Sequence, residues 1–528
     1  MDIRTQPAPR RLKFDERIQA LLLHHAKRQD DITRKQRVCA SQLIEWVSFG
    51  LAATNMARIA ERAGVSTATL YRLYPDRNNL TVDALKLGNN VLLETIQEAP
   101  RHPHPFRDLV EIVDHLLAIY RESSVLMLWH TQAFILQSET ETFADVQNNS
   151  ALFIQELQEF FFNIIDRLVS DGFIQDNNRL SMFLRIQGAI EDKTVEWQGR
   201  FKVPFQPVVS WSEEAVKIAE EFFIVHGTAK FRALRQQDQV AWLDGKSLQK
   251  KALEPVDETR LQASIDRQLP FLRDVEASLR AKPRPATTDA FIWQELERFM
   301  SKSGNRLDAS NRRSRIVASA IVVNYSQGFQ NVNMAAVAKQ AGVSTATLYR
   351  LYPDDRALYE AAHGLGTSFY MAWLAQESTS PNPLVQFCEY TSISIETFLD
   401  PRVKNAISMG AFTNALQQLD EHLSIGDLIV IYTNMLWRKR FARLLEEGFI
   451  DQPPSWDMLH ALQGTTSAIN GLYLRHGIQL QPNGSWFAEC RTVVDEFFQI
   501  YGTPHFHAMR KKMNWDEDLA LYKPGEVS

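Results

Sequence analysis

One segment of fourteen residues, AGVSTATLYRLYPD, occurs twice in the chain, at Ala63–Asp76 and again at Ala341–Asp354. An identical run of this length does not recur by chance in 528 residues, so the chain contains a duplication. The segment has the pattern of a helix end, a glycine turn and a second helix that begins at a serine cap. It predicts a helix-turn-helix, and therefore two copies of a DNA-reading motif in one chain.

The duplication extends beyond this segment. Asp171–Ile174 resembles Glu447–Ile450, and Glu220–Thr228 resembles Asp495–Thr503. The spacing changes only from 278 to 276 and 275 residues, so small loop changes separate the copies. The repeated unit has the size of a domain or two and is too long for a solenoid repeat. Because weaker matches run through both units, a shared binding task explains the identical segment better than a recent partial duplication does.

Charge is concentrated at the two motifs. The whole chain has a net charge of −5, which gives no general attraction to nucleic acid. From Arg34 to Arg77, however, seven basic and three acidic residues give +4, and from Arg312 to Arg356 six basic and two acidic residues again give +4. This local excess is what binding to a phosphate backbone requires.

The composition also indicates a compartment. The three cysteines form no CxxC pair and have no cysteine counterpart in the other copy, so we expect free thiols rather than zinc ligands or disulfides. The first residues lack the apolar core of a signal peptide, and no uncharged apolar run reaches membrane-spanning length. We expect a cytoplasmic protein with no cofactor, no metal and no membrane partner.

Helical periodicity dominates the chain and strand alternation is scarce, which predicts an all-α fold. The patterns predict helices over these ranges: Phe14–Ala26, Leu80–Gln97, Asp108–Tyr120, Ser124–Gln137, Ala151–Val169, Leu180–Trp197, Ser212–Val225, Phe291–Met300, Asp427–Glu446, Met458–His476 and Trp486–Ile500. The predicted order of domains is an N-terminal helical extension (1–30), helix-turn-helix domain 1 (31–90), helical regulatory domain 1 (91–235), a connector (236–305), helix-turn-helix domain 2 (306–368), helical regulatory domain 2 (369–510) and a C-terminal tail (511–528). We expect the connector to be partly helical and packed on the domains.

The motif predicts how DNA would be read. Asn55 and Ser66 are suited to cap its two helices, and a serine cap leaves backbone N–H groups that suit a phosphate. Thr67 and Thr69 are short enough to approach base edges, while Arg72 can reach a phosphate or a guanine. The predicted DNA contacts in both copies are Asn55, Ser66, Thr67, Thr69, Tyr71, Arg72, Tyr74, Arg77, Asn333, Ser344, Thr345, Thr347, Tyr349, Arg350, Tyr352 and Arg356.

The pattern G-x-x-x-x-N-M-x-x-I/V-A-x-x-A-G-V-S-x-x-x-L-Y-x-x-Y resembles the DNA-binding domain of the TetR/AcrR family of bacterial transcription regulators. The resemblance implies two tandem TetR-like units, each with a helical ligand-binding and dimerisation domain, and a repressor role. Two positions depart from the family: Tyr74 and Tyr352 stand where Phe is usual, and Arg77 and Arg356 stand near the place of a usual Lys. The family's two-fold dimers form through the last two helices, which implies pairing of 180–197 and 212–225 with 458–476 and 486–500 within one chain, with further homodimerisation as the alternative.

A ligand cavity is a second expectation for the helical domains. Bulky side chains at helical spacing can line a cavity, although such residues are more often ordinary core. The candidates are Trp129, His130, Phe134, Phe162, Met409, Phe412, Met435 and Trp437.

These patterns favour a DNA-binding transcription regulator, a repressor released by a small molecule, which reads an inverted-repeat operator in double-stranded DNA. The alternative is an architectural or interaction protein that the motifs tether to DNA. An enzyme is disfavoured, because adjacent carboxylates such as Glu191 and Asp192 do not face each other on a helix and no nucleophile or phosphate loop accompanies them.

Overall fold

The computed structural model describes residues 13–24, 30–50, 54–138, 143–194, 210–237, 258–281, 285, 287–301, 309–327, 333–403, 406 and 425–522. Helices make up these ranges, apart from turns and two isolated β-bridges, Ile174–Gly227 and Ile450–Gly502. The two bridges occupy equivalent places in the repeat. The predicted all-α fold of two tandem units is therefore confirmed.

The first unit contains eleven described helices. They are α1 (Phe14–His24), α2 (Asp31–Phe49), α3 (Met56–Ala63), α4 (Thr67–Leu73), α5 (Arg77–Gln97), α6 (Pro105–Tyr120), α7 (Ser123–Ser138), α8 (Phe143–Ser170), α9 (Arg179–Glu191), α10 (Trp211–His226) and α11 (Ala229–Gln237). The predicted helices are present, but α8 begins eight residues earlier than its apolar pattern indicated. The second half of the predicted range 180–197 lies partly outside the described residues.

The second unit repeats this order after three connector helices. The connector helices are α12 (Glu258–Gln268), α13 (Leu272–Ala281) and α14 (Thr288–Ser301). The second unit contains α15 (Ala309–Gln327), α16 (Met334–Ala341), α17 (Thr345–Leu351), α18 (Asp355–Leu374), α19 (Pro383–Leu399), α21 (Ile425–Glu446), α22 (Trp456–His476), α23 (Trp486–Tyr501), α24 (Pro504–Lys512) and α25 (Trp515–Leu521).

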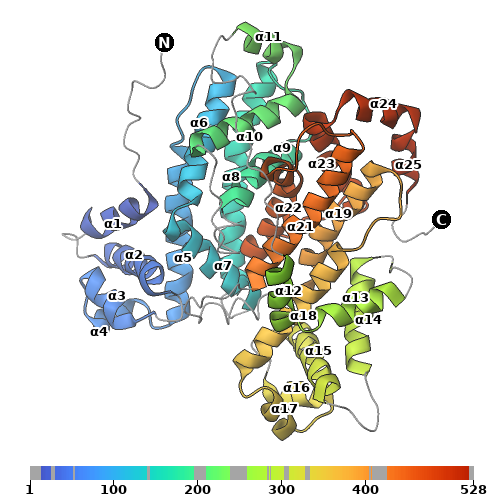
Figure 1. Cartoon of the computed structure of the whole chain (residues 1–528). Coiled ribbons are helices and arrows are strands. Elements are labelled where there is room, and N and C mark those ends of the chain that lie inside the picture. The colour runs from blue at the N-terminus through green and yellow to red at the C-terminus, as the bar shows by residue number, and fades with distance from the viewer. Residues whose placement is uncertain are drawn as a thin grey trace.

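Each unit has a small head joined to a larger helical body (Figure 1). The first head comprises α1–α4 and the second comprises α14–α17, with α14 packed on α15 as α1 is packed on α2. In Figure 1 both heads lie toward the lower part of the molecule, away from α11 and α24. The helices α5 and α18 connect each head to its body. This arrangement leaves the outer helices of both heads available to an external partner.

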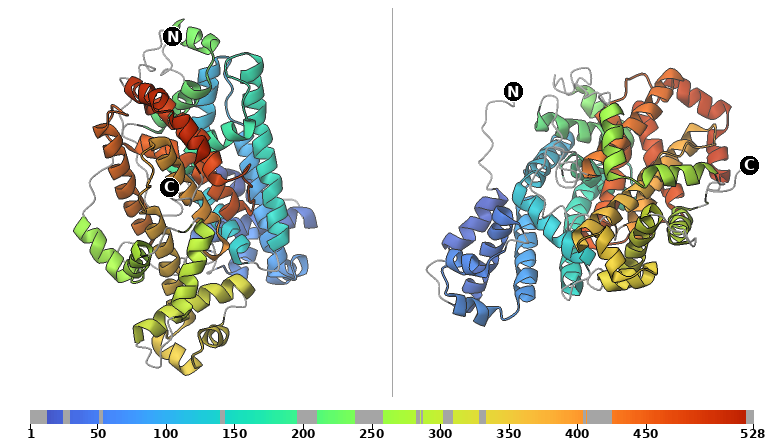
Figure 2. Two further views of the ribbon diagram at one scale, coloured as in Figure 1. Left: turned by 90° about the vertical axis from the view of Figure 1, so that its right-hand side faces the viewer. Right: turned by 60° about the horizontal axis from the view of Figure 1, so that its bottom comes forward.

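The connector is part of the second unit's core rather than a spacer. Leu261, Val275 and Phe291 from its three helices are buried in one apolar cluster with residues of α15–α18. The helices α12, α13 and α14 contact α21, α18 and α15 respectively, and Figure 2 shows the light green helices against the yellow and orange ones. The expectation that the connector is partly helical and packed on the domains is confirmed.

The predicted C-terminal tail contains a further helix, α25, within its described residues 511–522. α25 packs on α19, where Trp515 is buried and its carbonyl accepts a hydrogen bond from Asn382 Nδ2 at 2.8 Å. Residues 515–522 therefore belong to the second body, which the charged sequence of this segment did not indicate.

The two bodies pack against each other through α9 and α10 of the first unit and α22 and α23 of the second. Among the described helices, α9 and α22 share the most extensive contact. α22 also packs on α7, where Gln132 Nε2 donates to the carbonyl of Arg475 at 2.8 Å. One apolar cluster runs from the first body into α19, α22 and α23, so the core is continuous across this boundary. None of the helices in the described part of the chain combines the length and the apolar run needed to cross a bilayer.

Candidate nucleic-acid interface

The first helix of each motif begins at an asparagine cap. The Asn55 side chain accepts from the backbone N–H groups of Ala57 (2.9 Å) and Arg58 (3.2 Å). Asn333 caps the second copy by accepting from Ala336 N at 2.9 Å. Both asparagines have extended backbone and exposed side chains. The predicted caps are therefore confirmed, and they fix where α3 and α16 begin.

A glycine makes the turn in each copy. Gly64 and Gly342 have left-handed backbone, with φ of +65° and +62°. After each glycine the chain bonds back to the preceding helix, with Val65 N donating to the Ala60 carbonyl at 3.0 Å. The left-handed conformation is one that residues with a Cβ adopt at a cost, which explains why glycine stands at both turns.

The reading helices α4 and α17 have the same geometry. The hydroxyls of Ser66 and Ser344 each accept from a backbone N–H three residues later at 3.1 Å. Leu70 and Leu348 are fully buried and anchor each helix to its head. The two helices have the same sequence, and their serine caps make the same hydrogen bond. They therefore carry the same side chains on their exposed faces.

The exposed face of each reading helix is small, polar and aromatic. Thr67 and Thr345 are exposed, and Tyr71 and Tyr349 are 52% and 50% exposed. Thr69 is half-buried, and its hydroxyl lies 2.9 Å from Ser66 Oγ, as Thr347 Oγ1 does from Ser344 Oγ. The first threonine and the tyrosine are thus placed to meet an external surface, whereas the second threonine is shared with the cap.

Tyr74 and Tyr352 lie in the wrong place for the predicted DNA contact. Tyr74 is 2% and Tyr352 is 8% exposed. The Tyr74 hydroxyl donates to Asp83 at 2.9 Å and lies 3.2 Å from Cys39 Sγ. Burial raises the pKa of Tyr352 to about 12. These tyrosines end the reading helix as core residues, and we withdraw them as phosphate contacts.

Arg72 and Arg350 are equivalent in sequence but differ in their surroundings. Arg72 donates two hydrogen bonds to Asp31, from Nη1 at 3.0 Å and from Nη2 at 2.8 Å. The hydrogen bond from Arg72 holds the pKa of Asp31 down to about 2. In the second copy Ala309 stands at the position of Asp31, and no ion pair to Arg350 is found among the described residues. In the first head, therefore, Asp31 holds Arg72 in an ion pair. In the second head Arg350 has no such ion pair among the described residues and is available to an external partner.

Two further arginines of the first head are also held internally. Buried Glu45 accepts from Arg58 Nε at 2.7 Å and from Arg62 Nη1 at 3.2 Å. The second copy has Val323 in place of Glu45, with Ala336 and Gln340 in place of the arginines. The equal net charges counted from sequence therefore overstate the positive charge that the first head presents.

Arg77 and Arg356 occupy the first turn of the helix after each motif. Arg77 is the first residue of α5 and is exposed. Arg356 is exposed and pairs with Glu360 at 3.0 Å. Both side chains are on the outer surface, so they remain candidates for phosphate contacts.

None of the predicted ligand residues that the structure describes lines either of the two cavities described below. Trp129 and Trp437 are each 1% exposed and belong to packed aromatic groups, Trp129 against Tyr120 at 4.8 Å and Trp437 against Phe441 at 5.7 Å between ring centroids. Of the other candidates, His130 is exposed, Phe162 and Met435 are half-buried, and the Phe134 side chain, Met409 and Phe412 lie outside the described residues. Ordinary core packing explains the two tryptophans, and a ligand role for the other candidates stays a prediction.

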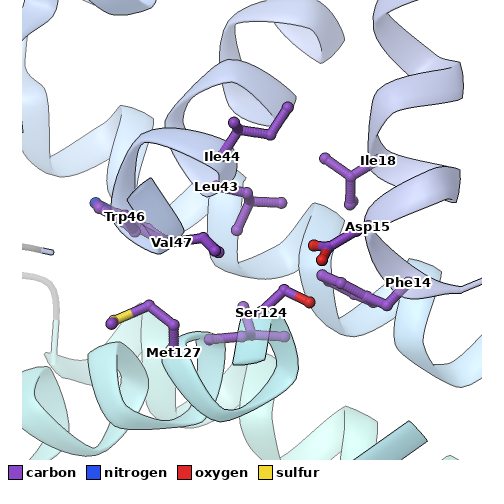
Figure 3. Close-up of a pocket in the computed structure, with 10 residues that line it drawn as sticks. Phe14, Asp15, Ile18, Leu43, Ile44, Trp46, Val47, Ser124 and Met127 are labelled. Carbon is purple, nitrogen blue, oxygen red and sulfur yellow. The ribbon is translucent and has the colours of Figure 1, made fainter. Parts of the chain in front are cut away.

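Two small cavities lie elsewhere. The first, of about 10 Å³, lies where α1, α2 and α7 meet, between the first head and its body (Figure 3). Phe14, Leu43, Trp46 and Met127 are among its lining residues, and the Ser124 hydroxyl also points into this region. The second, of about 20 Å³, lies between α9, α10 and α22 and is lined by Arg185, Glu221 and Ala461, among others. Each has room for about one or two water molecules, so neither holds an organic effector as it stands.

Sequence reasoning missed Asp31 and Glu45, which control the arginines of the first head. No group of three or more His, Cys, Asp and Glu side chains suited to a metal ion occurs within the described ranges. The three cysteines are buried, and burial raises the pKa of Cys39 to about 12. A signal for Asp31 was present in the sequence, because it follows a capping Asp30 at the start of a basic helix and has alanine as its counterpart.

Comparisons with known proteins give matches at the two motifs. The family model described as "Bacterial regulatory proteins, tetR family" matches residues 45–83 and 316–362. HTH-type transcriptional regulators of Mycobacterium tuberculosis and Mycobacterium bovis, both described as uncharacterised, are 39% identical over 60 residues. The match covers 11% of this chain and 30% of the length of those relatives.

Solved structures also match part of the chain. A TetR transcriptional regulator from Agrobacterium tumefaciens is 17% identical with a TM-score of 0.31, and covers 38% of this chain and 97% of its own. A candidate TetR-family regulator from Mesorhizobium loti is 15% identical with a TM-score of 0.32, and covers 38% of this chain and 100% of its own.

Proposed function

The chain belongs to the TetR family and carries two TetR-type units, and from this we propose that it is a transcription regulator that binds double-stranded DNA with both heads. The proposal includes an inverted-repeat operator, a repressor role and release by a small-molecule effector. The observation that carries it is that α4 and α17 have one sequence and one geometry. Helix-turn-helix proteins read DNA through the second helix of such a motif.

The pairing of the bodies supports an inverted repeat. α9 and α10 pack on α22 and α23, their counterparts in the second unit, so the two units face each other as the subunits of a two-fold dimer do. A two-fold relation places two identical reading helices in opposite directions along the DNA. We propose that one chain supplies what two chains supply in an ordinary dimeric regulator.

The exposed residues assign roles within each head. We propose Thr67 and Thr345 as base readers, Tyr71 and Tyr349 as phosphate or sugar contacts, and Arg72, Arg77, Arg350 and Arg356 as phosphate contacts. The capping residues Asn55, Ser66, Asn333 and Ser344, with Thr69 and Thr347, position the reading helices and offer backbone N–H groups to the DNA backbone. We also propose 31–90 and 306–368 as the two DNA-binding domains and the bodies as the regulatory domains.

The test is DNA binding by variants of the exposed face. Thr67→Ala and Thr345→Ala are each expected to relax base preference in one half-site, at about 1–3 kcal/mol for a good contact. Tyr71→Phe with Tyr349→Phe should weaken binding on all sequences alike. A matched control is Leu152→Ala, because Leu152 is 61% exposed on α8, a helix that belongs to neither motif. Unchanged affinity and base preference in the double threonine variant would refute these roles.

The effector requires its own experiment. A metabolite library should be screened for compounds that release the protein from its operator in a saturable way. Release by one compound supports the regulator, whereas DNA binding that no compound changes, together with capture of specific protein partners, supports the architectural alternative.

A further inference from the structure

We propose that the surface of α9 and α10 and the surface of α22 and α23 have diverged so that each accepts the other and rejects a copy of itself. This inference rests on the proposed pairing of the two units and concerns which partner each surface selects. The partner that fits the first surface is then the second unit, and not the first unit of another chain.

The two units meet at equivalent positions. Gly188 and Gly464 are 276 residues apart, the spacing of the repeat in this region. A Cβ atom on Gly188 would collide with the carbonyl of Gly464 and lie 2.9 Å from Thr465 N, and one on Gly464 would lie 3.1 Å from Ala189 N. Equivalent residues that touch lie on a two-fold axis, so α9 and α22 cross on a local pseudo-two-fold axis.

A second contact confirms the axis. The Tyr501 hydroxyl donates to Glu221 at 2.9 Å, and the counterparts of these two residues, His226 and Glu496, lie 3.7 Å apart. The contacts in a pair of two identical units can therefore be inferred. One residue of each observed cross-unit contact is replaced by its counterpart in the other unit.

The first surface would repel itself at Asp192. In the structure this buried carboxylate accepts from Ser467 Oγ at 2.7 Å and is hydrogen-bonded to His460. The first-unit counterparts of Ser467 and His460 are Glu191 and Leu184. Two paired first units would thus place Asp192 opposite Glu191 and Leu184, twice. Bringing these buried like charges together is strongly unfavourable, even though Gln187 Nε2 donates to Glu191 at 2.7 Å within the first unit.

The second unit also supplies the partner that Glu191 needs. Arg475 forms an ion pair with Glu191, and both side chains are more than nine-tenths buried. The donors and cations that satisfy Glu191 and Asp192 across the boundary therefore come from α22 alone. The position in the first unit that corresponds to Arg475 lies outside the described residues, so the case against pairing of two first units rests on Asp192.

The second surface would leave two of its own carboxylates without cations. Glu496 pairs with Arg185, and Asp457 lies 3.5 Å from Lys217 Nζ and 3.8 Å from Lys193 Nζ. The counterparts of Arg185, Lys193 and Lys217 are Ala461, Ile469 and Thr492, none of them a cation. Two paired second units would therefore place Glu496 opposite Ala461 and Asp457 opposite Ile469, which buries the charges without their main cross-unit partners.

Selectivity is thus built from contacts that favour the mixed pair and oppose both self-pairs, which is how specific interfaces discriminate. One contact works the other way, because two first units would still place Arg185 opposite Glu221. The like charges of Asp192 and Glu191, present twice, oppose that pairing. The consequence for the full chain is that its own two units are matched partners.

The experiment places the first unit's residue into the second unit of the full-length chain. Ser467→Glu installs a carboxylate opposite Asp192 and should lower the melting temperature by about 5 °C or more. Ser467→Ala removes the hydrogen bond without adding charge and should lower it by less than half as much. Adding Asp192→Ala to Ser467→Glu removes the repulsion and should restore most of the loss.

Light scattering of the same proteins at micromolar concentration completes the test. The wild type should have the mass of one chain, 60.5 kDa. The inference is overturned if Ser467→Glu and Ser467→Ala have the same melting temperature, if Asp192→Ala does not restore the loss caused by Ser467→Glu, or if the wild type and all the variants have the mass of two chains. None of these measurements contains DNA, so failure of the proposed DNA-binding function leaves them unaffected and is distinguished from failure of the pairing.

Discussion

The close crossing of α9 and α22 makes Gly188→Ala a direct test of how the bodies pair. Alanine is the better helix former, so the substitution should stabilise an isolated α9 by about 0.5–1 kcal/mol. In the structure, however, the new methyl would meet backbone rather than a movable side chain, at 2.9 Å from Thr465 N and nearer still to the carbonyl of Gly464. The two helices must move apart to accept it.

The size of the loss follows from this geometry. Carbon contacts are favourable at about 3.5 Å, so the clash with the Gly464 carbonyl requires α9 and α22 to separate by about 1 Å or more, and a gap of about 0.5–1 Å already forfeits about a quarter to a half of each dispersion contact. Because this is the most extensive helix contact among the described residues, we expect a loss near the upper end for overpacked cores, about 3 kcal/mol. The charged pairs that flank the crossing would lengthen with it.

Urea unfolding of the full chain measures this loss, and Gly88→Ala is the matched control. Gly88 also lies inside a helix, but its added methyl would meet the movable end of Leu128, 2.6 Å away. Gly88→Ala should therefore cost less than Gly188→Ala, since Leu128 can change rotamer. If Gly188→Ala unfolds at the same urea concentration as the wild type, the two glycines do not form the crossing point and the account of the pairing is wrong.

Three further results are expected. Asp31→Asn should free Arg72 and tighten operator binding at low salt by up to about fivefold, while Ala309→Asp should weaken it; equal affinities in a filter-binding assay would contradict the asymmetry. Burial and the nearby Arg185 lower the pKa of His226 from 6.5 to about 3, so the unfolded chain binds this proton first and stability should fall as pH drops below 6.5, by about 1.4 kcal/mol per pH unit. His226→Phe should make urea unfolding between pH 6 and pH 5 less pH-dependent, and an unchanged slope would argue against a neutral buried imidazole. Ser344→Ala should cost about 1 kcal/mol by removing the α17 cap, which differential scanning calorimetry can detect.

Local chemistry explains what the sequence predicted well. The asparagine and serine caps, the left-handed glycines and the buried Leu70 and Leu348 all follow from contacts within a few residues. The helices of the bodies followed from their periodicity for the same reason. Such features depend on residues that are close together in the sequence, so they can be predicted without knowledge of the fold.

Contacts between distant residues were not predictable in this way. The sequence predicted that Tyr74 is exposed at the end of the reading helix. In the structure its hydroxyl is hydrogen-bonded to Asp83 and Cys39 inside the head. Asp31 and Arg72 are 41 residues apart, so their ion pair lay outside any local pattern. A charge count treats every arginine as available, whereas the fold decides which ones are paired.

The two tryptophans among the ligand candidates show a related limit of sequence patterns. Trp129 and Trp437 have the size and spacing of cavity-lining residues, and core residues have the same size and spacing. Only the packing of neighbouring helices separates the two cases. The family resemblance implied pairing through the last two helices of each unit, and α9 and α10 pack on α22 and α23 in the structure. The residues that select the mixed pair became visible only when counterparts in the two units were compared in space.

Selection of binding sites from random DNA, with the number of chains per site measured on the selected sequence, tests the central claim most directly. Two identical reading helices related by a pseudo-two-fold axis predict an inverted repeat whose half-site centres lie about 10 bp apart, or a multiple of one turn, bound by one chain. The half-site under the first head should tolerate more changes in its flanking positions, because the arginines of that head are paired internally. A direct repeat, a single isolated half-site, or two chains on one inverted repeat would contradict the account.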